Sequence, residues 1–212
     1  MADFRIPKIT ELLTQLNENS EEVIKCFDAV IGLDAAYDRH FLIGDIDPDV
    51  GETIEAYIRF FNKMDEEQGL EVEDRQPIVL FIDSYGGDLN ACFSIVDAIE
   101  MSETPIYTVN MGTAYSAGFF ISIAGHKRFA YPHASFLYHE GSAGNQGTAN
   151  QFENFSAFYK KQLNMLREHT LKHTKISEEK YNEIKKDDFW MTAPEALELG
   201  VIDEITTSLE IK

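Results

Sequence analysis

The spacing of apolar side chains changes near residue 77, and the change separates two parts of the chain. Before residue 77, apolar residues recur every three or four positions, which is the period of amphipathic helices. We expect two short helices within residues 1–35, a short strand in "RHFLIGDID" (39–47) and a helix over about 50–67. The last helix carries apolar residues at positions 54, 57, 58 and 61, so one of its faces should cover a core.

After residue 77, continuous apolar runs alternate with glycine turns and helical patterns. The runs "PIVLFIDS" (77–84) and "PIYTVNM" (105–111) are typical of strands that are buried on both faces of a sheet. The segments "LNACFSIVDAIEM" (89–101) and "AYSAGFFISIAG" (114–125) have the pattern of helices. This alternation predicts an α/β fold with a parallel sheet, in which both glycine turns lie at equivalent strand ends. Ligands bind at such ends.

The last third of the chain predicts two short strands followed by one long helix. The strands are "RFAY" (128–131) and "SFLYHEGS" (135–142), and the helix runs from about Thr148 to His173. Its apolar positions form one stripe that drifts around the helix. A helix of this length exceeds what a small domain needs, so we expect part of it to reach toward another subunit.

Composition limits the class of partner. The chain has 18 Lys and Arg residues against 37 Asp and Glu, and its formal net charge of −19 argues against binding to nucleic acid or to an anionic membrane. No run approaches the roughly 18 consecutive apolar residues of a membrane span, and the N-terminus does not resemble a secretory signal. Cys26 and Cys92 stand in apolar, helix-like surroundings, which predicts buried thiols in a reducing cytoplasm.

The segment "GTAYSAGFF" (112–120) places one hydroxyl among small residues where a buried strand meets a helix. Gly112 and Gly118 permit the tight turn and close packing that expose a nucleophile at a helix N-terminus, as in serine hydrolases. Taken alone, the segment is also compatible with Ser116 as an ordinary residue at the start of a helix. The segment therefore has two interpretations.

The segment "DSYGGD" (83–88) ends the neighbouring buried strand. Adjacent glycines let the backbone turn and point free N–H groups outward, which is what an oxyanion hole requires. Paired glycines are also common at ordinary turns between a strand and a helix. By itself this motif is a weak signal.

His139 ends an apolar strand before the glycine-rich segment "GSAGNQG" (141–147). An imidazole suits general-base work near neutral pH, although a single histidine at a strand end is often structural. The acid that would orient it should lie near another strand end. Asp187 and Asp188 fit this position, because they stand just before an apolar step and a helix.

The other histidines carry less signal. His126 and His133 flank "KRFAYP" (127–132), where the pattern predicts a turn and its exit. His169 and His173 have the i, i+4 spacing of metal ligands on the long helix, but no companion glutamate motif accompanies them. We therefore interpret this pair as a solvated helix end and expect no metal.

At these motifs the chain resembles the proteolytic subunit of the Clp protease (ClpP), from about Arg39 to Ile205. The resemblance is specific because several motifs agree in order and in spacing. They are "FIDSYGGD", "VNMGTAYSAGFF", "PHASFLYHEGSAGNQG" and "KKDDFWMTAPEALELGVIDEI". The resemblance implies an α/β fold of the ClpP/crotonase type, with stacked βαβ units and a protruding handle helix.

Position by position, the resemblance implies a serine-protease triad in this chain. It implies Ser116 as the nucleophile, His139 as the general base and Asp188 as the acid that orients the imidazole. The amides of Gly87 and Ala117 would form the oxyanion hole. The further substrate-binding positions that it implies are Gly86, Gly141, Ser142, Ala143 and Gly144.

The resemblance also implies an assembly. Members of the family form two face-to-face seven-membered rings that enclose the active sites, and "TANQFENFSAFYKK" (148–161) looks like the helix that joins the rings. An AAA+ unfoldase is a further implied partner, polypeptides and peptides are the implied substrates, and no cofactor is implied. The apolar surface that receives the unfoldase is only partly retained, at Phe81, Met111, Phe129 and Tyr131.

The chain departs from the family pattern beside the motifs and at its N-terminus. Tyr85 stands where the family's turn usually has Pro, and Ala117 stands where Met commonly follows the nucleophile. An amide donates from either residue, so neither change removes a catalytic group. Residues 1–35 match no part of the family, so we expect a helical N-terminal extension before a single protease domain at 36–212.

Two other classes of protein remain open. Crotonases share the fold and act on acyl-CoA thioesters, but they do not need a Ser, His and Asp set. A structural ring subunit that has lost activity is the non-enzyme alternative, although all three catalytic residue types are present here. We therefore predict a serine endopeptidase that cleaves unfolded polypeptides and peptides inside an oligomeric chamber in the cytoplasm.

Overall fold

The computed structural model describes residues 39–209 and 211. The chain divides into two compact units, residues 1–41 and 42–212. The elements that carry the predicted motifs belong to the second unit. The helices predicted within residues 1–35 lie outside the described residues, so that extension stays a prediction.

Strands and helices alternate along the described chain, as the sequence predicts. The strands are β1 (His40–Ile43), β2 (Ile78–Ser84), β3 (Ile106–Tyr115), β4 (Lys127–Ala130), β5 (Ser135–Tyr138), β6 (Phe189–Thr192) and β7 (Glu204–Ile205). The helices are α3 (Pro48–Glu67), α4 (Leu89–Met101), α5 (Ala117–Ala124), α6 (Ala149–His173), α7 (Glu178–Ile184) and α8 (Ala193–Glu198), with a short 3-10 helix at Val72–Asp74.

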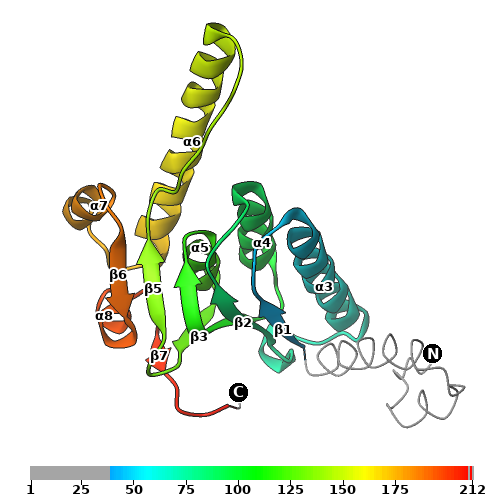
Figure 1. The fold of residues 1–212 in the computed structure, drawn as a ribbon. Coiled ribbons are helices and arrows are strands. Elements are labelled where there is room, and N and C mark those ends of the chain that lie inside the picture. Colours follow the sequence, from blue (N-terminus) through cyan, green and yellow to red (C-terminus); the bar gives the residue numbers. More distant parts are fainter. Residues whose placement is uncertain (1–38, 210, 212) are drawn as a thin grey trace, which may run out of the picture. The chain divides into compact units, whose positions relative to one another are not determined.

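The strands form one seven-stranded sheet around β3. Along one side β3 pairs in parallel with β2; along its other side the first half pairs with β4 and the second half with β5, again in parallel. Strand β7 lies beside β4, β1 lies beside β2, and β6 runs antiparallel to β5. The β2–α4–β3 and β3–α5–β4 units confirm the predicted α/β fold with a largely parallel sheet (Figure 1).

The core lies between this sheet and the helices packed on it. Helices α3, α4 and α5 contact one another in that order, and α5 also contacts α6 (Figure 1). Every residue of α5 is buried, and Phe119 and Ile121 on this helix are among the largest fully buried side chains. None of the helices in the described part of the chain is both long and apolar enough to cross a membrane.

Strand β3 is longer than the sequence predicts. It continues to Tyr115, although the segment from Ala114 onward has a helical pattern. The side chain of Asp83 explains the extension, because its Oδ1 accepts hydrogen bonds from the amide and the hydroxyl of Thr113, at 3.0 and 2.9 Å. These bonds bridge the register shift that separates Ile82 from Ser84 in the β2–β3 ladder. The strand then continues by pairing with β5.

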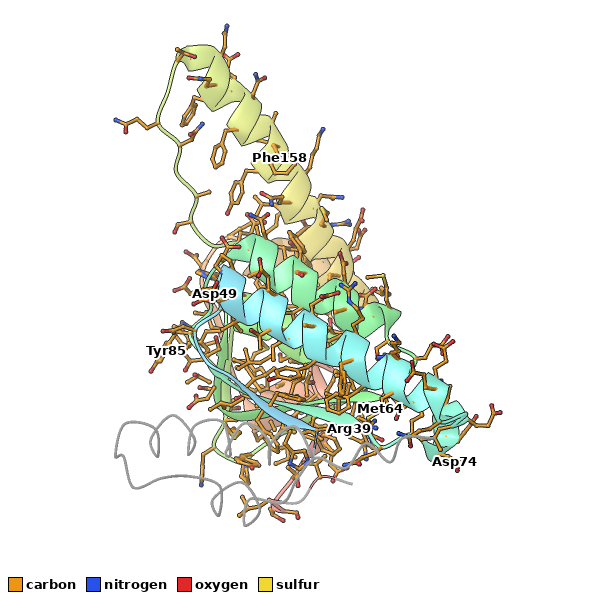
Figure 2. All side chains as sticks on the ribbon, turned by 90° about the vertical axis from the view of Figure 1, so that its right-hand side faces the viewer. Arg39, Asp49, Met64, Asp74, Tyr85 and Phe158 are labelled. Carbon is orange, nitrogen blue, oxygen red and sulfur yellow. The ribbon has the colours of Figure 1, made fainter. Side chains whose placement is uncertain are left out.

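Helix α6 confirms the long helix predicted from about residue 148 to 173. Thr148 and Gln151 form a capping box at its start, which satisfies N–H groups that the helix itself cannot pair. Only Leu166 and Thr170 are buried along its 25 residues. Its first half projects away from the sheet, and Phe158 on this half is 56% exposed (Figures 1 and 2). The projecting helix is the handle that the resemblance implies.

Arg128 on β4 joins segments that are distant along the chain. Its guanidinium donates to both carboxylate oxygens of Asp203, with Nε–Oδ2 at 3.0 Å and Nη2–Oδ1 at 2.6 Å. It also donates to the carbonyl oxygens of His173 and Gly200. Burial raises the pKa of Asp203, but the hydrogen bonds from Arg128 outweigh burial and hold that pKa below its usual value. The Arg128 guanidinium therefore ties the end of α6 to the β4–β7 edge.

We expect Asp203→Asn to lower the free energy of unfolding by about 1 kcal/mol near pH 7, less than a fully buried charged hydrogen bond because Asp203 is partly exposed. The folded-state pKa is depressed, so the carboxylate stabilises the fold above its unfolded pKa of about 3.9. That stability is lost as the pH falls through the folded value. Urea unfolding across this range should show wild type and variant converging below about pH 4. A difference that does not change with pH would contradict a role for the charge.

Candidate active site

Ser116 occupies the junction between β3 and α5 in a strained conformation. Its φ of 54° and ψ of −120° are rare for a residue other than glycine. Its side chain makes no capping hydrogen bond to α5, although a serine that merely starts a helix usually does so. The amide donates to the carbonyl of Leu137 on β5 at 3.0 Å, which fixes the turn to the neighbouring strand. These features favour the nucleophile interpretation over the helix-cap interpretation.

The turn after β2 approaches Ser116 closely because it contains two glycines. A Cβ atom on Gly86 would lie 2.8 Å from the Cβ of Ser116, and one on Gly87 would overlap the carbonyl oxygen of Ile46. The glycines have φ values of 109° and 150°, which other residues rarely adopt. The loop before α3 holds the turn, since the Ile46 amide donates to Gly86 and the Ile46 carbonyl accepts from Asp88. Figure 2 shows Tyr85 of this turn at the same end of the unit as Asp49, at the start of α3.

The two amides predicted to form an oxyanion hole are available. Within the described residues, neither the Gly87 amide nor the Ala117 amide donates a hydrogen bond. The Gly86 amide, in contrast, donates to the Ser84 hydroxyl at 3.0 Å, and the Gly86 carbonyl accepts from Ile46. Both backbone polar groups of Gly86 are therefore already hydrogen-bonded. The role of Gly86 in substrate binding would be indirect, because its missing side chain lets the turn approach Ser116.

His139 and Asp188 face each other across the β5–β6 pair. Tyr138 pairs with Phe189 in this antiparallel ladder. His139 follows Tyr138 and Asp188 precedes Phe189, so these two residues lie opposite each other. The separation between His139 Nδ1 and Asp188 Oδ1 is 3.6 Å, longer than a hydrogen bond. Nε2 of His139 is buried and has no hydrogen-bond partner, so it is not bonded to the Ser116 hydroxyl. The motifs alone leave Asp187 and Asp188 open, and the resemblance implies Asp188; in the structure Asp188 is the carboxylate that faces His139.

The sheet thus brings the predicted residues to one of its edges. The glycine turn follows β2, Ser116 follows β3 and His139 follows β5, and these three strands are parallel neighbours. Asp188 precedes β6, which is antiparallel, and so it reaches the same edge (Figure 1). The hydrogen bonds that would connect the three side chains of a triad are not formed in this structure.

The segment after His139 differs from its prediction. The strand predicted over 135–142 ends at Tyr138, and residues 139–148 have no regular secondary structure. This segment runs beside α6 (Figure 1), where the Tyr159 hydroxyl donates to the Glu140 carbonyl at 2.7 Å. The substrate-binding positions expected here are all exposed to solvent, namely Gly141, Ser142, Ala143 and Gly144.

Three aromatic side chains beside the predicted site were missed by the sequence reasoning. The ring of Tyr115 makes edge-to-face contacts with Tyr85 at 5.5 Å and with Trp190 at 5.1 Å between centroids. Tyr85 and Trp190 are 75% and 55% exposed. Tyr85 and Tyr115 directly precede Gly86 and Ser116, and Trp190 follows Asp188 by two positions. The sequence contains a signal for these residues, because an aromatic residue stands close to Gly86, to Ser116 and to Asp188.

Residues expected to receive an unfoldase gather in one apolar cluster, with one exception. Phe129 is buried with Val79 and Val109, and the partly buried residues packed against this group include Phe81 and Tyr131. The other partly buried members are Tyr107 and Ile211. Met111 is outside the cluster. The three buried members lie on β2, β3 and β4.

For the remaining titratable groups, the structure confirms some predictions and corrects another. Cys92 is a free, buried thiol, as predicted, and burial raises its pKa; Cys26 lies outside the described residues. His126 is structural, since its Nδ1 accepts from the Ile106 amide at 3.0 Å. The interpretation of His169 and His173 as a solvated helix end is wrong: their side chains are only 9% and 18% exposed, because α6 packs them against neighbouring helices.

The parallel sheet and the projecting helix define a protein of the ClpP/crotonase fold. Residues 41–209 match the Clp protease family. The chain is 35% identical over 204 residues to the ATP-dependent Clp protease proteolytic subunit 2 of Nocardia farcinica, which covers 90% of this chain and 94% of that protein. It is 27% identical over 195 residues to the protein of that name from Treponema denticola, covering 91% and 94%. This chain therefore belongs to the Clp protease family, a family of peptidases.

Proposed function

We propose that this chain is a serine endopeptidase of the Clp type. Ser116 is the nucleophile, His139 the general base and Asp188 the acid that orients the imidazole. The observation that carries the proposal is the strained, uncapped backbone of Ser116, at the edge where the β5 and β6 ends also meet. In this proposal the Ser116 hydroxyl reacts beside the amides of Gly87 and Ala117, neither of which donates a hydrogen bond within the described residues.

The reaction follows from these positions. Nε2 of His139 takes the Ser116 proton as the hydroxyl attacks a peptide carbonyl, and the amides of Gly87 and Ala117 bind the oxyanion. The imidazolium returns the proton to the leaving amine, and water then releases the acyl group from Ser116. Both contacts of His139 must shorten for these transfers, as catalytic hydrogen bonds often do on binding substrate. A buried Nε2 without a partner is compatible with that movement.

Substrate and assembly belong to the same proposal. Polypeptides and peptides bind along residues 141–148, which are exposed to solvent and whose backbone can pair with an extended chain. Two seven-membered rings, joined through the first half of α6, enclose the sites in the cytoplasm. An AAA+ unfoldase docks on the apolar cluster around Phe81, Phe129 and Tyr131, and Met111 has weaker support because it lies outside that cluster.

The assembly is testable through the exposed aromatics of α6. Phe152 and Phe158 are 55% and 56% exposed, so burying them against a second ring would stabilise the particle. We expect a native mass of fourteen chains for wild type and of seven for Phe152→Glu with Phe158→Glu, because buried carboxylates oppose the contact. Met101→Glu, at an exposed methionine on α4, is the control and should keep the wild-type mass. A monomeric wild type would contradict the chamber.

The activity is tested with a fluorogenic peptide and with a folded protein, each with and without an unfoldase. We expect the peptide to be cleaved and the folded protein to be spared until an unfoldase and ATP are added. The unformed Ser116–His139 hydrogen bond favours one alternative, a structural ring subunit without activity. That alternative predicts the same particle mass and no cleavage of peptide. Hydrolysis of an acyl-CoA thioester instead would favour a crotonase-like enzyme.

A further inference from the structure

Two histidines and a glutamate meet where α6 passes the last turn of α4. His169 and His173 are one turn apart on α6, and Glu100 is the penultimate residue of α4. Oε1 of Glu100 lies 3.3 Å from Nδ1 of His169 and 2.8 Å from Nε2 of His173. One ligand atom from each residue lies within 4.8 Å of the other two. The cluster lies outside the site proposed for peptide hydrolysis and needs its own explanation.

A hydrogen bond fixes the tautomer of His169. Its Nε2 lies 2.9 Å from the carbonyl oxygen of Phe120, which can only accept, so Nε2 carries a proton. The second nitrogen, Nδ1, is therefore the ring atom that can bind a cation, and it faces Oε1 of Glu100 at 3.3 Å. A cation between these two atoms could bond to both of them.

The spacing of these atoms suits a transition metal. Zn²⁺ binds histidine nitrogen and carboxylate oxygen at about 2.0–2.2 Å, which puts neighbouring atoms of a tetrahedral shell roughly 3.4 Å apart. The two nitrogens already lie 3.3 and 2.8 Å from Oε1. The bond from His169 to the Phe120 carbonyl is of the kind that usually orients a metal-binding histidine. Only small side-chain shifts are needed to admit an ion.

The charge and the access of the cluster are compatible with a cation. The Glu100 side chain accepts hydrogen bonds from Lys172 and His173, one on each carboxylate oxygen, so both oxygens are held in place. Nζ of Lys172 lies 2.5 Å from Oε2, the oxygen that does not face the histidines, and its side chain is 60% exposed. A cavity of about 260 Å³ lined by Glu100 and His169 gives access from solvent. A second cavity, of about 300 Å³, is lined by His173.

We propose that Glu100, His169 and His173 form a binding site for a divalent transition metal, with Zn²⁺ as the expected ion. Oε1 of Glu100, Nδ1 of His169 and Nε2 of His173 supply three ligands, and water from the adjoining cavities completes the shell. The proton on Nε2 of His173 moves to Nδ1 or to solvent when the ion binds. The ion links α4 to the base of the projecting helix, so it fixes the direction of α6.

The test is a calorimetric titration of Zn²⁺ into the full chain after metal has been removed with a chelator, with Co²⁺ as a spectroscopic probe. We expect saturable binding of one ion per chain to this site, a rise in unfolding temperature with Zn²⁺, and visible absorption bands of tetrahedral Co²⁺. Absence of binding would overturn the proposal. These readouts do not depend on peptidase activity.

Matched variants assign the binding to this cluster. Glu100→Gln and His169→Gln should each lower the affinity for Zn²⁺ at least about 10-fold. His133→Gln removes an exposed histidine outside the cluster and should leave the affinity unchanged. Equal affinities in wild type and Glu100→Gln would overturn the proposal.

Lys172→Ala separates a metal site from an ion-pair cluster without removing a ligand. It frees Oε2 of Glu100 and removes a positive charge, so the affinity for Zn²⁺ should stay the same or rise. Unfolding temperature measured in chelator should fall at the same time, because an ion pair is lost. A fall in Zn²⁺ affinity would show that Lys172 belongs to the site as built and would overturn the proposed ligand set.

Discussion

Ser116→Ala is expected to lower the rate of peptide hydrolysis by about 10⁴-fold or more, with little change in stability. The variant removes the hydroxyl that is proposed to attack the peptide carbonyl and keeps the Cβ atom, so the turn has no new contact to accommodate. The oxyanion amides remain, so weak residual hydrolysis above the rate in water is expected. The measurement is single-substrate kinetics with a fluorogenic peptide, on particles whose native mass equals that of wild type.

The matched control is Ser94→Ala, which removes an exposed hydroxyl on α4 and should leave the rate unchanged. A fluorophosphonate probe provides a second readout, because it forms a covalent bond only with an activated serine. Wild type and Ser94→Ala should be labelled at Ser116, and Ser116→Ala should not be labelled. Labelling of a different residue, or an unchanged rate in Ser116→Ala, would contradict the assignment of the nucleophile.

Gly87→Ala is expected to lower the free energy of unfolding by about 2–4 kcal/mol and to reduce hydrolysis strongly. The new Cβ would overlap the Ile46 carbonyl oxygen, and alanine is strained at a φ of 150°. The turn must therefore separate from the loop before α3, which displaces the Gly87 amide from the oxyanion position. Denaturant unfolding and peptide kinetics measure the two effects.

Gly44→Ala is the control for this prediction. A Cβ on Gly44 would have no atom within 4 Å, so the substitution should be close to neutral in stability and in rate. The comparison separates the effect of crowding from the general effect of losing a glycine in the unfolded chain. Equal stabilities of the two variants would contradict the close approach between Gly87 and Ile46.

Apolar periodicity was sufficient to predict α3, α4 and α6, whereas α7 was not predicted. The bounds of α4 agree with the apolar pattern, and Thr148 with Gln151 marks the start of α6 because each side chain pairs with the other's backbone. The turn residues after the first buried run likewise indicate that β2 ends at Ser84. These features depend on residues close in sequence, so a single sequence contains them.

Features that depend on register could not be predicted in the same way. Asp83 extends β3 past its predicted end because it bonds to Thr113 on another strand. Local chemistry leaves Asp187 and Asp188 open, and only the family resemblance predicts Asp188; the β5–β6 ladder places Asp188 opposite His139. Glu100 completes the pair His169 and His173 from an earlier helix, so no local motif announces it. In each case the deciding contact joins residues that are distant along the chain.

The loop before α3 has a consequence for how the site can be switched off. The Ile46 amide donates to the Gly86 carbonyl at 3.0 Å, and the Asp88 amide donates to the Ile46 carbonyl at 2.7 Å. These two hydrogen bonds form a strand-like bridge that also shapes the glycine turn. Both amide hydrogens should exchange with deuterated solvent slowly and at the same rate, because separation of the loop from the turn breaks both hydrogen bonds at once. A partner that accelerates this exchange would distort the glycine turn proposed to bind the oxyanion, without contacting Ser116.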